Sequence, residues 1–210
     1  MVRKKLGVSS AKELNGATIC TQQGTTTELN LADFFRSNNI KYEVVAFATA
    51  DETFKAYTSG RCDAFTTDGS ALFAERLRAS NPDEHVVLPE IISKEPFGLV
   101  VRHGDNQWGD LVRWVHFAML NAEELGVTKA NVDQMTKSDN PEIKRLLGTE
   151  GKFGEATGLT NDWGVRIVKH MGNYGEIFER NIGEGSPLKI KRGLNALWNK
   201  GGLQYGIPIR

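Results

Sequence analysis

Hydrophobic and polar residues follow two different patterns along the chain. Up to about residue 105, short apolar runs alternate with helical segments of roughly ten residues, as in a parallel sheet with crossover helices. The candidate strands are Val2–Lys5, Thr18–Gln22, Tyr42–Phe47, Ala64–Thr67, Val86–Leu88 and Phe97–Arg102. This part of the chain is therefore predicted to be α/β.

Helix starts between these runs are marked by three sequences of the capping-box type. In each, a Ser or Thr is followed three residues later by Glu, so that both side chains can bond to free backbone amides. The three sequences are Ser10–Glu13, Thr25–Glu28 and Thr49–Glu52. Gly16, Gly60 and the Asn38–Asn39 pair are suitable helix ends, because they tolerate the left-handed conformation.

The second half of the chain is predicted to be mainly helical. Apolar residues recur at helical spacing from Trp108 to Leu125, and no further strand is indicated. The tryptophans at 108, 114, 163 and 198 fall within helical segments and are interpreted as core residues. Further helices are predicted over Asn131–Lys137, Pro141–Leu147, Asn161–Asn181 and Leu188–Asn199.

The charge of the chain argues against nucleic acid and anionic membranes as partners. The 26 basic residues balance 26 acidic ones without any block of like charge, and 40% hydrophobic residues are ordinary for a globular protein. The basic start Met1–Lys5 is followed by the polar stretch Leu6–Asn15, so we expect no signal peptide in this chain. No window approaches the roughly 20 apolar residues that a membrane span needs.

The stretch Thr21–Glu28 is a candidate anion site, because a strand end, a glycine turn and a hydroxyl-rich helix start follow one another there. Free amides at a helix start, together with the helix dipole, bind carboxylates or phosphates. An ordinary capped helix explains the same residues.

A second strand runs into a helix within Gly60–Ser70 and places Asp68 after the strand's carboxyl end, where open parallel sheets bind ligands. Asp68 can hold a ligand ammonium group or cap the following helix, and for a lone Asp the cap is the commoner role. Asp63 is interpreted as a turn residue.

No motif indicates catalysis or metal binding. The histidines at 85, 103, 116 and 170 lack metal-ligand spacing, and there is no Cys-x-x-Cys, nucleophile elbow or nucleotide fingerprint. We therefore predict no catalytic residue, no metal and no cofactor. Composition leaves open whether Cys20 and Cys62 form a disulfide or remain buried thiols.

Several motifs together resemble the general L-amino-acid branch of the periplasmic binding proteins, the family 3 extracellular solute-binding proteins. The resemblance covers essentially the whole chain. The motifs are Leu14–Cys20, Gln22–Glu28, Ser59–Asp63, Thr67–Asp68, Gly158–Trp163, Gly172–Glu176, Gly193–Trp198 and Gly201–Arg210. It implies a type II periplasmic-binding-protein-like α/β fold, in which two hinge strands join two lobes that clamp an amino acid.

The resemblance implies one complete doubly wound lobe plus a mainly helical C-terminal segment of the other lobe. Residues 1–102 would be the second lobe, with the hinge strands Val2–Lys5 and Phe97–Arg102 at its ends. Residues 103–210 would pack on a first lobe that we expect to be absent from this truncated chain. Without that partner the apolar stripe Trp108–Leu125 is expected to drive self-association, and amino-acid binding by the chain alone is expected to be weak.

The resemblance also implies ligand contacts. Thr26 and Thr27 resemble the residues that bind the ligand carboxylate, and Asp68 resembles the acid that holds the α-ammonium group. Thr67 faces the same cleft, and Gln22 can approach the ligand side chain. The helix start at Thr26 and Thr27 complements the carboxylate of an amino acid, and Asp68 complements its ammonium group. Because the two together match both charged groups, the ligand interpretation of Asp68 is now preferred to the helix cap.

The implied function is the periplasmic substrate-binding component of an ABC transporter, with free L-amino acids as ligands and the transporter permease as partner. The breadth of the family suggests polar and acidic amino acids among the ligands. In the exported protein Cys20 and Cys62 are predicted to form a disulfide, since their strands should neighbour each other at the ligand edge. The alternatives are a dehydratase of the cyclohexadienyl or arogenate type on the same fold, and an inactive fragment. Asp68 and the lack of a general acid and base pair favour binding.

Overall fold

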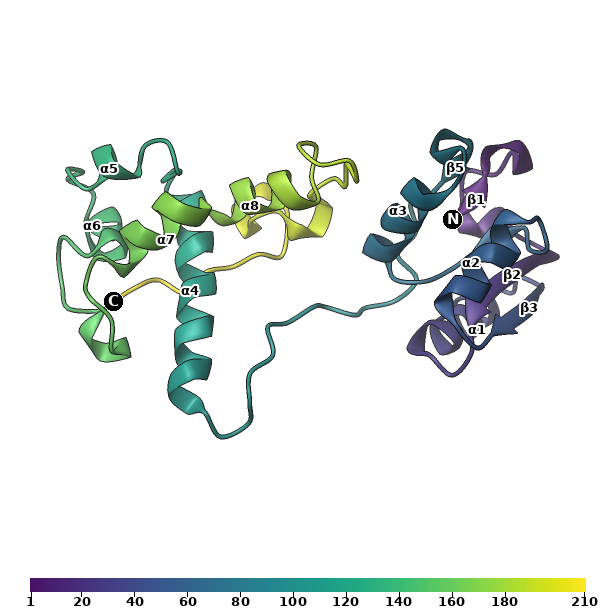
Figure 1. The fold of residues 1–210 in the computed structure, drawn as a ribbon, viewed down its shortest axis with the longest axis horizontal. Helices are drawn as coiled ribbons and strands as arrows, with labels where there is room; N and C mark the ends of the chain where they lie inside the picture. The colour runs from purple at the N-terminus through teal and green to yellow at the C-terminus, as the bar shows by residue number, and fades with distance from the viewer. The chain divides into compact units, whose positions relative to one another are not determined.

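The computed structural model describes all 210 residues, which divide into two compact units, Met1–Pro96 and Phe97–Arg210 (Figure 1). The first unit contains the sheet, and the second is helical. The sequence places the boundary after Arg102, whereas the compact units meet between Pro96 and Phe97. The assignment of these units to two lobes stays a prediction.

The sheet of the first unit has five strands in the order β3-β2-β4-β1-β5. They are β1 (Val2–Arg3), β2 (Ala17–Gln22), β3 (Tyr42–Phe47), β4 (Ala64–Phe65) and β5 (His85–Val86). β2 pairs in parallel with both β3 and β4, as the sequence predicts. β1 instead runs antiparallel between β4 and β5, so the sheet is mixed.

Three helices cover the two faces of this sheet: α1 (Thr26–Ser37), α2 (Ala50–Thr58) and α3 (Gly69–Arg78). Successive residues of a strand point to opposite faces. Ile19 of β2 packs with Leu31 and Phe35 of α1, whereas the adjacent Cys20 packs with Tyr57 of α2. Leu72 of α3 lies in the same cluster as Cys20. The unit is therefore doubly wound, with α1 on one face and α2 and α3 on the other.

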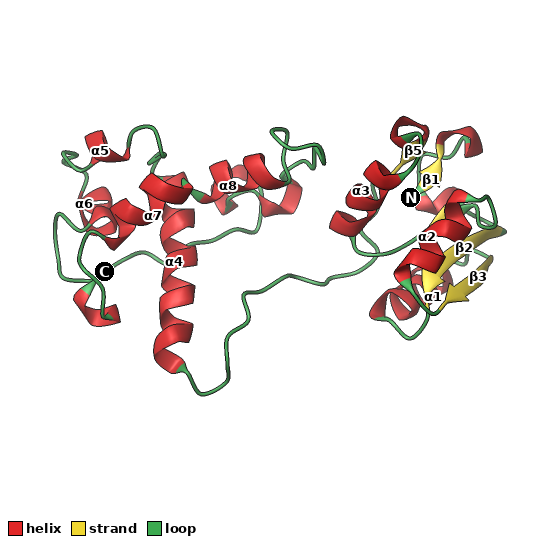
Figure 2. Ribbon diagram, viewed as in Figure 1, coloured by secondary structure: helices red, strands yellow, loops and turns green.

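The second unit is built from helices and loops (Figure 2). The helices are α4 (Asn106–Glu124), α5 (Val132–Met135), α6 (Pro141–Leu147), α7 (Trp163–Met171) and α8 (Tyr174–Asn181). Its core includes Ala118 and Ala122 of α4, Leu146 of α6 and Trp163 of α7. None of the helices combines the length and the apolarity needed to cross a membrane.

Three predicted elements from residue 97 onwards differ in the structure. Phe97–Arg102 forms no strand, because its backbone has no neighbouring strand to pair with, and Leu99 remains 68% exposed. The predicted helix over 161–181 is two helices, since Gly172 adopts a positive φ of 85° and Asn173 starts α8.

The third difference is the predicted helix over 188–199, which is wrong. Lys189 has a positive φ of 51°, which does not fit a right-handed helix, and only the 3-10 turns Gly193–Asn195 and Trp198–Lys200 form. The interpretation of all four tryptophans as core residues is also wrong, because Trp108 and Trp198 are each 53% exposed.

Candidate functional site

The predicted ligand residues lie at one edge of the sheet, where the parallel strands β2, β3 and β4 end. Gln22 is paired in register with Phe47, and Cys20 with Phe65. Thr67 follows Phe65 by two residues, as Gln22 follows Cys20, so Gln22 and Thr67 leave the sheet at the same level. The Gln22 side chain donates its Nε2 to the carbonyl oxygen of Ala48 at 3.2 Å, which ties the end of β2 to the loop after β3.

The start of α1 is open in the structure. Gly24 turns the chain with a positive φ of 71°, and its amide donates to the Glu28 carboxylate at 2.8 Å. The Thr25 hydroxyl donates to the carbonyl oxygen of Gln22 at 2.8 Å and makes no side-chain cap. The predicted capping box is therefore not formed. The hydroxyl groups of Thr26 and Thr27 make no hydrogen bond, and the first amides of a helix have no partner within it.

The start of α3 is also open. Asp68 occupies the N-cap position, but its carboxylate accepts no hydrogen bond from the helix and forms no ion pair. The side chain is exposed, so the helix-cap interpretation of Asp68 does not describe the structure. Thr67 is half-buried, and its hydroxyl makes no hydrogen bond. A helix start without a side-chain cap and a free carboxylate thus follow two neighbouring parallel strands.

Asp63 lies at the opposite end of β4 and has a structural role. Its carboxylate accepts hydrogen bonds from the amide of Thr18 at 2.9 Å and from the hydroxyl of Thr18 at 2.7 Å. These bonds hold the pKa of Asp63 below its ordinary value. The interpretation as a turn residue agrees with this position.

The cysteines form a disulfide beneath the candidate site. Cys20 in β2 and Cys62 before β4 have Cα atoms 5.7 Å apart, and both are fully buried. Arg3 of β1 donates to the carbonyl oxygens of Tyr57 and Cys62, both at 2.7 Å. The Tyr57 hydroxyl lies 2.7 Å from Nδ1 of His85, and burial raises the pKa of Tyr57 to about 12. Strands β1, β2 and β4 and helix α2 are therefore held together at this point.

Thr21 is a polar residue near this edge that the sequence reasoning did not select. It lies in β2, is fully buried, and its hydroxyl has no hydrogen-bond partner. Threonine is common in strands, so the sequence alone carries no signal for it. No group of three or more His, Cys, Asp or Glu side chains is arranged to hold a metal ion.

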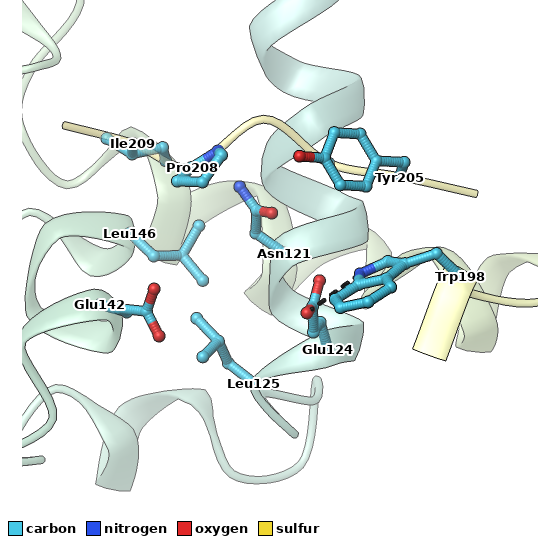
Figure 3. A pocket seen from close by; sticks show the side chains of 10 residues that line it. Asn121, Glu124, Leu125, Glu142, Leu146, Trp198, Tyr205, Pro208 and Ile209 are labelled. Carbon is cyan, nitrogen blue, oxygen red and sulfur yellow. Dashed lines mark hydrogen bonds between the residues drawn. The ribbon is translucent and has the colours of Figure 1, made fainter. Parts of the chain in front are cut away.

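Two cavities lie elsewhere, in residues 97–210. One of about 150 Å³ is bordered by α4, α6 and the C-terminal tail, and Figure 3 shows its lining side chains. The other, about 490 Å³, is an apolar groove between α4 and α7 that includes Trp108, Val112 and Ile167. Neither contains a predicted ligand residue, so the predicted site is defined by chain topology and free polar groups and not by an enclosed cavity.

No family model matches the chain. Individual proteins do match it along its whole length. It is 62% identical to the general L-amino acid-binding periplasmic protein AapJ of Rhizobium johnstonii. It is 56% identical to the glutamate/glutamine/aspartate/asparagine-binding protein BztA of Rhodobacter capsulatus. Both alignments include 100% of this chain, which spans about 62% of the length of these relatives.

A solved structure agrees with the sequence relatives. An ABC transporter periplasmic binding protein from Brucella ovis, with glutathione bound, matches with a TM-score of 0.91 and 64% identity. The match covers 100% of this chain and 66% of the other. Fold and comparisons together define the class, that of the periplasmic binding proteins of ABC transporters. Within this class, both sequence relatives are named as amino-acid-binding proteins, not as enzymes.

Proposed function

We propose that this chain is part of a periplasmic amino-acid-binding protein that serves an ABC transporter. The residues that follow β2 and β4 form one part of its binding site. The observation that carries the proposal is the pair of open helix starts at one sheet edge. The amides and hydroxyls of Thr26 and Thr27 suit a carboxylate, and the free carboxylate of Asp68 suits an ammonium group. An α-amino acid presents both charged groups on one carbon atom.

Polar and acidic L-amino acids are the proposed ligands. The names of AapJ and BztA support this class, because they include general L-amino acids and the four residues glutamate, glutamine, aspartate and asparagine. Glutathione, bound in the Brucella ovis protein, ends in a glutamyl group with free α-ammonium and α-carboxylate groups. The same pair of helix starts can therefore serve either a free amino acid or a glutamyl end, with Gln22 and Thr67 beside it.

The proposed location is the periplasm, and the proposed partner is the membrane permease of the transporter. AapJ and the Brucella ovis protein are named as periplasmic, and the disulfide between Cys20 and Cys62 suits an oxidising compartment.

Isothermal titration calorimetry tests the ligand proposal. The 210-residue chain is titrated with L-glutamate, L-glutamine and glutathione, both alone and in place of the matching part of Rhizobium johnstonii AapJ. We expect millimolar affinity or weaker for the chain alone, since an open helix start contributes about 0.3–1 kcal/mol. The chimera should bind much more tightly, because small-molecule sites bury most of the ligand surface.

Asp68→Asn in the chimera should weaken binding about tenfold or more, through loss of a charge-assisted hydrogen bond. Asp83→Asn, an exposed aspartate in the turn before β5, is the matched control and should leave affinity unchanged. Equal affinity of the Asp68→Asn chimera and the parent chimera, with equal melting temperatures, would remove Asp68 from the site.

The apolar groove between α4 and α7 supports a second part of the proposal, that the 210-residue chain self-associates. Trp108 at the groove is 53% exposed, and exposed apolar patches of this kind usually become interfaces. Light scattering should give a mass above 23.2 kDa. Trp108→Ser and Val112→Ser together should restore the monomer, and a monomeric parent chain would contradict this part.

A further inference from the structure

Three side chains meet on the α2 face of the sheet, next to its edge strand β5. Arg3 of β1 and His85 of β5 are directly opposite each other in the antiparallel pair, so their side chains point to the same face. The Arg3 guanidinium lies over the ring of Tyr57, 5.0 Å from its centroid. The rings of Tyr57 and His85 meet edge to face, with centroids 5.4 Å apart. Helix α2 is thus in contact with both strands through Tyr57.

The hydrogen bond between Tyr57 and His85 has a defined direction. The Tyr57 hydroxyl lies 2.7 Å from Nδ1 of His85 and has no other partner. Tyr57 is fully buried, and burial raises its pKa to about 12, so the hydroxyl keeps its proton at ordinary pH. A buried O–H group without an acceptor is costly, so Tyr57 donates and Nδ1 accepts. His85 is therefore neutral in this structure, with its proton on Nε2.

Protonation of His85 opposes this arrangement in two ways. Nδ1 becomes a donor, so the Tyr57 hydroxyl loses its acceptor within a buried contact. The new positive charge also lies directly opposite that of Arg3, and like charges directly opposite each other on paired strands are destabilising. Arg3 is held in this position, because it donates to the carbonyl oxygens of Tyr57 and Cys62, both at 2.7 Å.

The other charged groups around His85 do not cancel these effects. Burial, followed by the charge of Arg3, holds the pKa of His85 below its ordinary value, although Glu84 beside it acts in the opposite direction. The amino group of Met1 also disfavours the charged imidazole. That amino group donates to the carbonyl oxygen of Phe65 at 2.7 Å, and burial lowers its pKa to about 5. The effects of His85 and Met1 therefore have to be separated by experiment.

Strand β5 has few other contacts that hold it in the sheet. It consists of two residues, lies at the edge and pairs with β1 alone. On the opposite face from His85, the half-buried Val86 packs against the cluster that contains Val2 and Leu14. The contact of His85 with Tyr57 is thus a large part of what attaches β5 to the rest of the first unit.

We propose that His85 and Tyr57 form a pH-sensitive switch, in which β5 pairs with β1 while His85 is neutral and is released when His85 is protonated. An unfolded chain binds this proton at the ordinary pKa of 6.5, and the folded chain binds it only at lower pH. The pairing is therefore fully stable above that pH and loses stability as the pH falls below it. Because β5 is the last strand before the second unit begins at Phe97, its release loosens the segment that joins the two units.

Hydrogen exchange of the 210-residue chain, followed by mass spectrometry and corrected for the chemical exchange rate, tests this switch between about pH 7.5 and about pH 5. At the lower pH, peptides containing β1 and β5 should exchange about two- to tenfold faster relative to those of β2 and β3, the effect of losing one net hydrogen bond. No such acceleration would contradict the proposal.

His85→Asn keeps an acceptor near the position of Nδ1 but does not titrate, so the acceleration in β5 should disappear. His103→Asn, at an exposed histidine outside this cluster, is the matched control and should behave as the parent chain does. Acceleration that persists unchanged in His85→Asn would assign the effect to the amino group of Met1 and overturn the proposal.

Nuclear magnetic resonance of the imidazole nitrogens gives a second test that needs no variant. In the folded chain at neutral pH, Nδ1 of His85 should carry no proton, and the ring should become protonated at a lower pH than in the urea-unfolded chain. A proton on Nδ1 at neutral pH, or protonation at the same pH in the folded and unfolded chains, would each refute the switch.

Discussion

The two units differ in how many of their helices have a side chain that caps the first turn. In residues 97–210, three helices are capped by their own side chains: Asp105 accepts from the amide of Trp108, Asn140 from that of Glu142, and Asn173 from that of Glu176. In residues 1–96, only α2 is capped in this way, by Thr49, whose capping box with Glu52 is complete. The two helices that start at the candidate ligand edge, α1 and α3, have no side-chain cap.

An open helix start is informative only in combination with its position. Helices α5 and α7 also lack side-chain caps, but neither follows a parallel strand. In α1 and α3 the open start coincides with the carboxyl ends of neighbouring strands, and residues able to cap, Thr25 and Asp68, are present without doing so. Side chains therefore cap three helices of the second unit, whereas the two helices that start at the candidate ligand edge of the first unit have no side-chain cap.

The largest expected effect is a loss of stability in the first unit that the second unit does not share. Replacing Cys20 and Cys62 by Ala should lower the free energy of unfolding of residues 1–96 by about 2–5 kcal/mol. Residues 97–210 should keep their stability, because the disulfide lies wholly within the first unit. Hydrogen exchange followed by mass spectrometry measures both units in one sample. Equal loss of protection in both would show that they unfold together.

A smaller loss of stability is expected when the side-chain cap of α8 is removed. Asn173→Ala removes the cap to Glu176 and a buried hydrogen bond, 2.9 Å long, from Nδ2 to the carbonyl oxygen of Val127. The expected loss in the second unit is about 2–3 kcal/mol, measured by urea unfolding. Asn181→Ala, at the exposed end of the same helix, is the control and should cost less than about 0.5 kcal/mol. Similar losses from both variants would mean that the cap is not the stabilising group.

The smallest expected effect comes from comparing two helix starts within the first unit, one with a side-chain cap and one without. Thr49→Ala should cost about 1 kcal/mol, because it removes a working cap. Asp68→Asn should change the free energy of unfolding by less than about 0.5 kcal/mol, since its side chain bonds to nothing in the structure. Chemical denaturation gives both values. A loss at Asp68 as large as that at Thr49 would make Asp68 a structural residue.

The sequence predicted correctly those helices and strands whose boundaries are determined by neighbouring residues in the chain. Tyr42–Phe47 and Pro141–Leu147 have the predicted boundaries, because a compact apolar run defines the first and Pro141 and Gly148 bound the second. Phe97–Arg102 has the composition of a strand, but a strand also needs a neighbour, which sequence composition does not supply. The break at Gly172 has a local cause that the reading of the sequence missed, since Gly172 has a positive φ and Asn173 and Glu176 form a capping box at the start of α8.

The candidate residues were predictable to different degrees. The position of Thr26, Thr27 and Asp68 after strand ends follows from the order of elements, whereas their role came from the resemblance to a family. The cavity of the second unit could not be predicted, because Asn121, Glu142 and Tyr205 are distant in sequence and meet only through packing. Trp198 was interpreted as core for the same reason.

The position of β1 in the sheet has a consequence for how the chain folds during synthesis. Val2 pairs with both Ala64 and Val86, so β1 can complete its pairing only after the chain has been made as far as β5. At about 5–20 residues per second, roughly 4–17 s separate the synthesis of Val2 from that of Val86. Strands β2 and β3, which are closer in sequence, can pair during that interval. Strand β1 then pairs with β4 on one side and with β5 on the other, and until it does so Arg3 cannot reach the carbonyl groups of Tyr57 and Cys62.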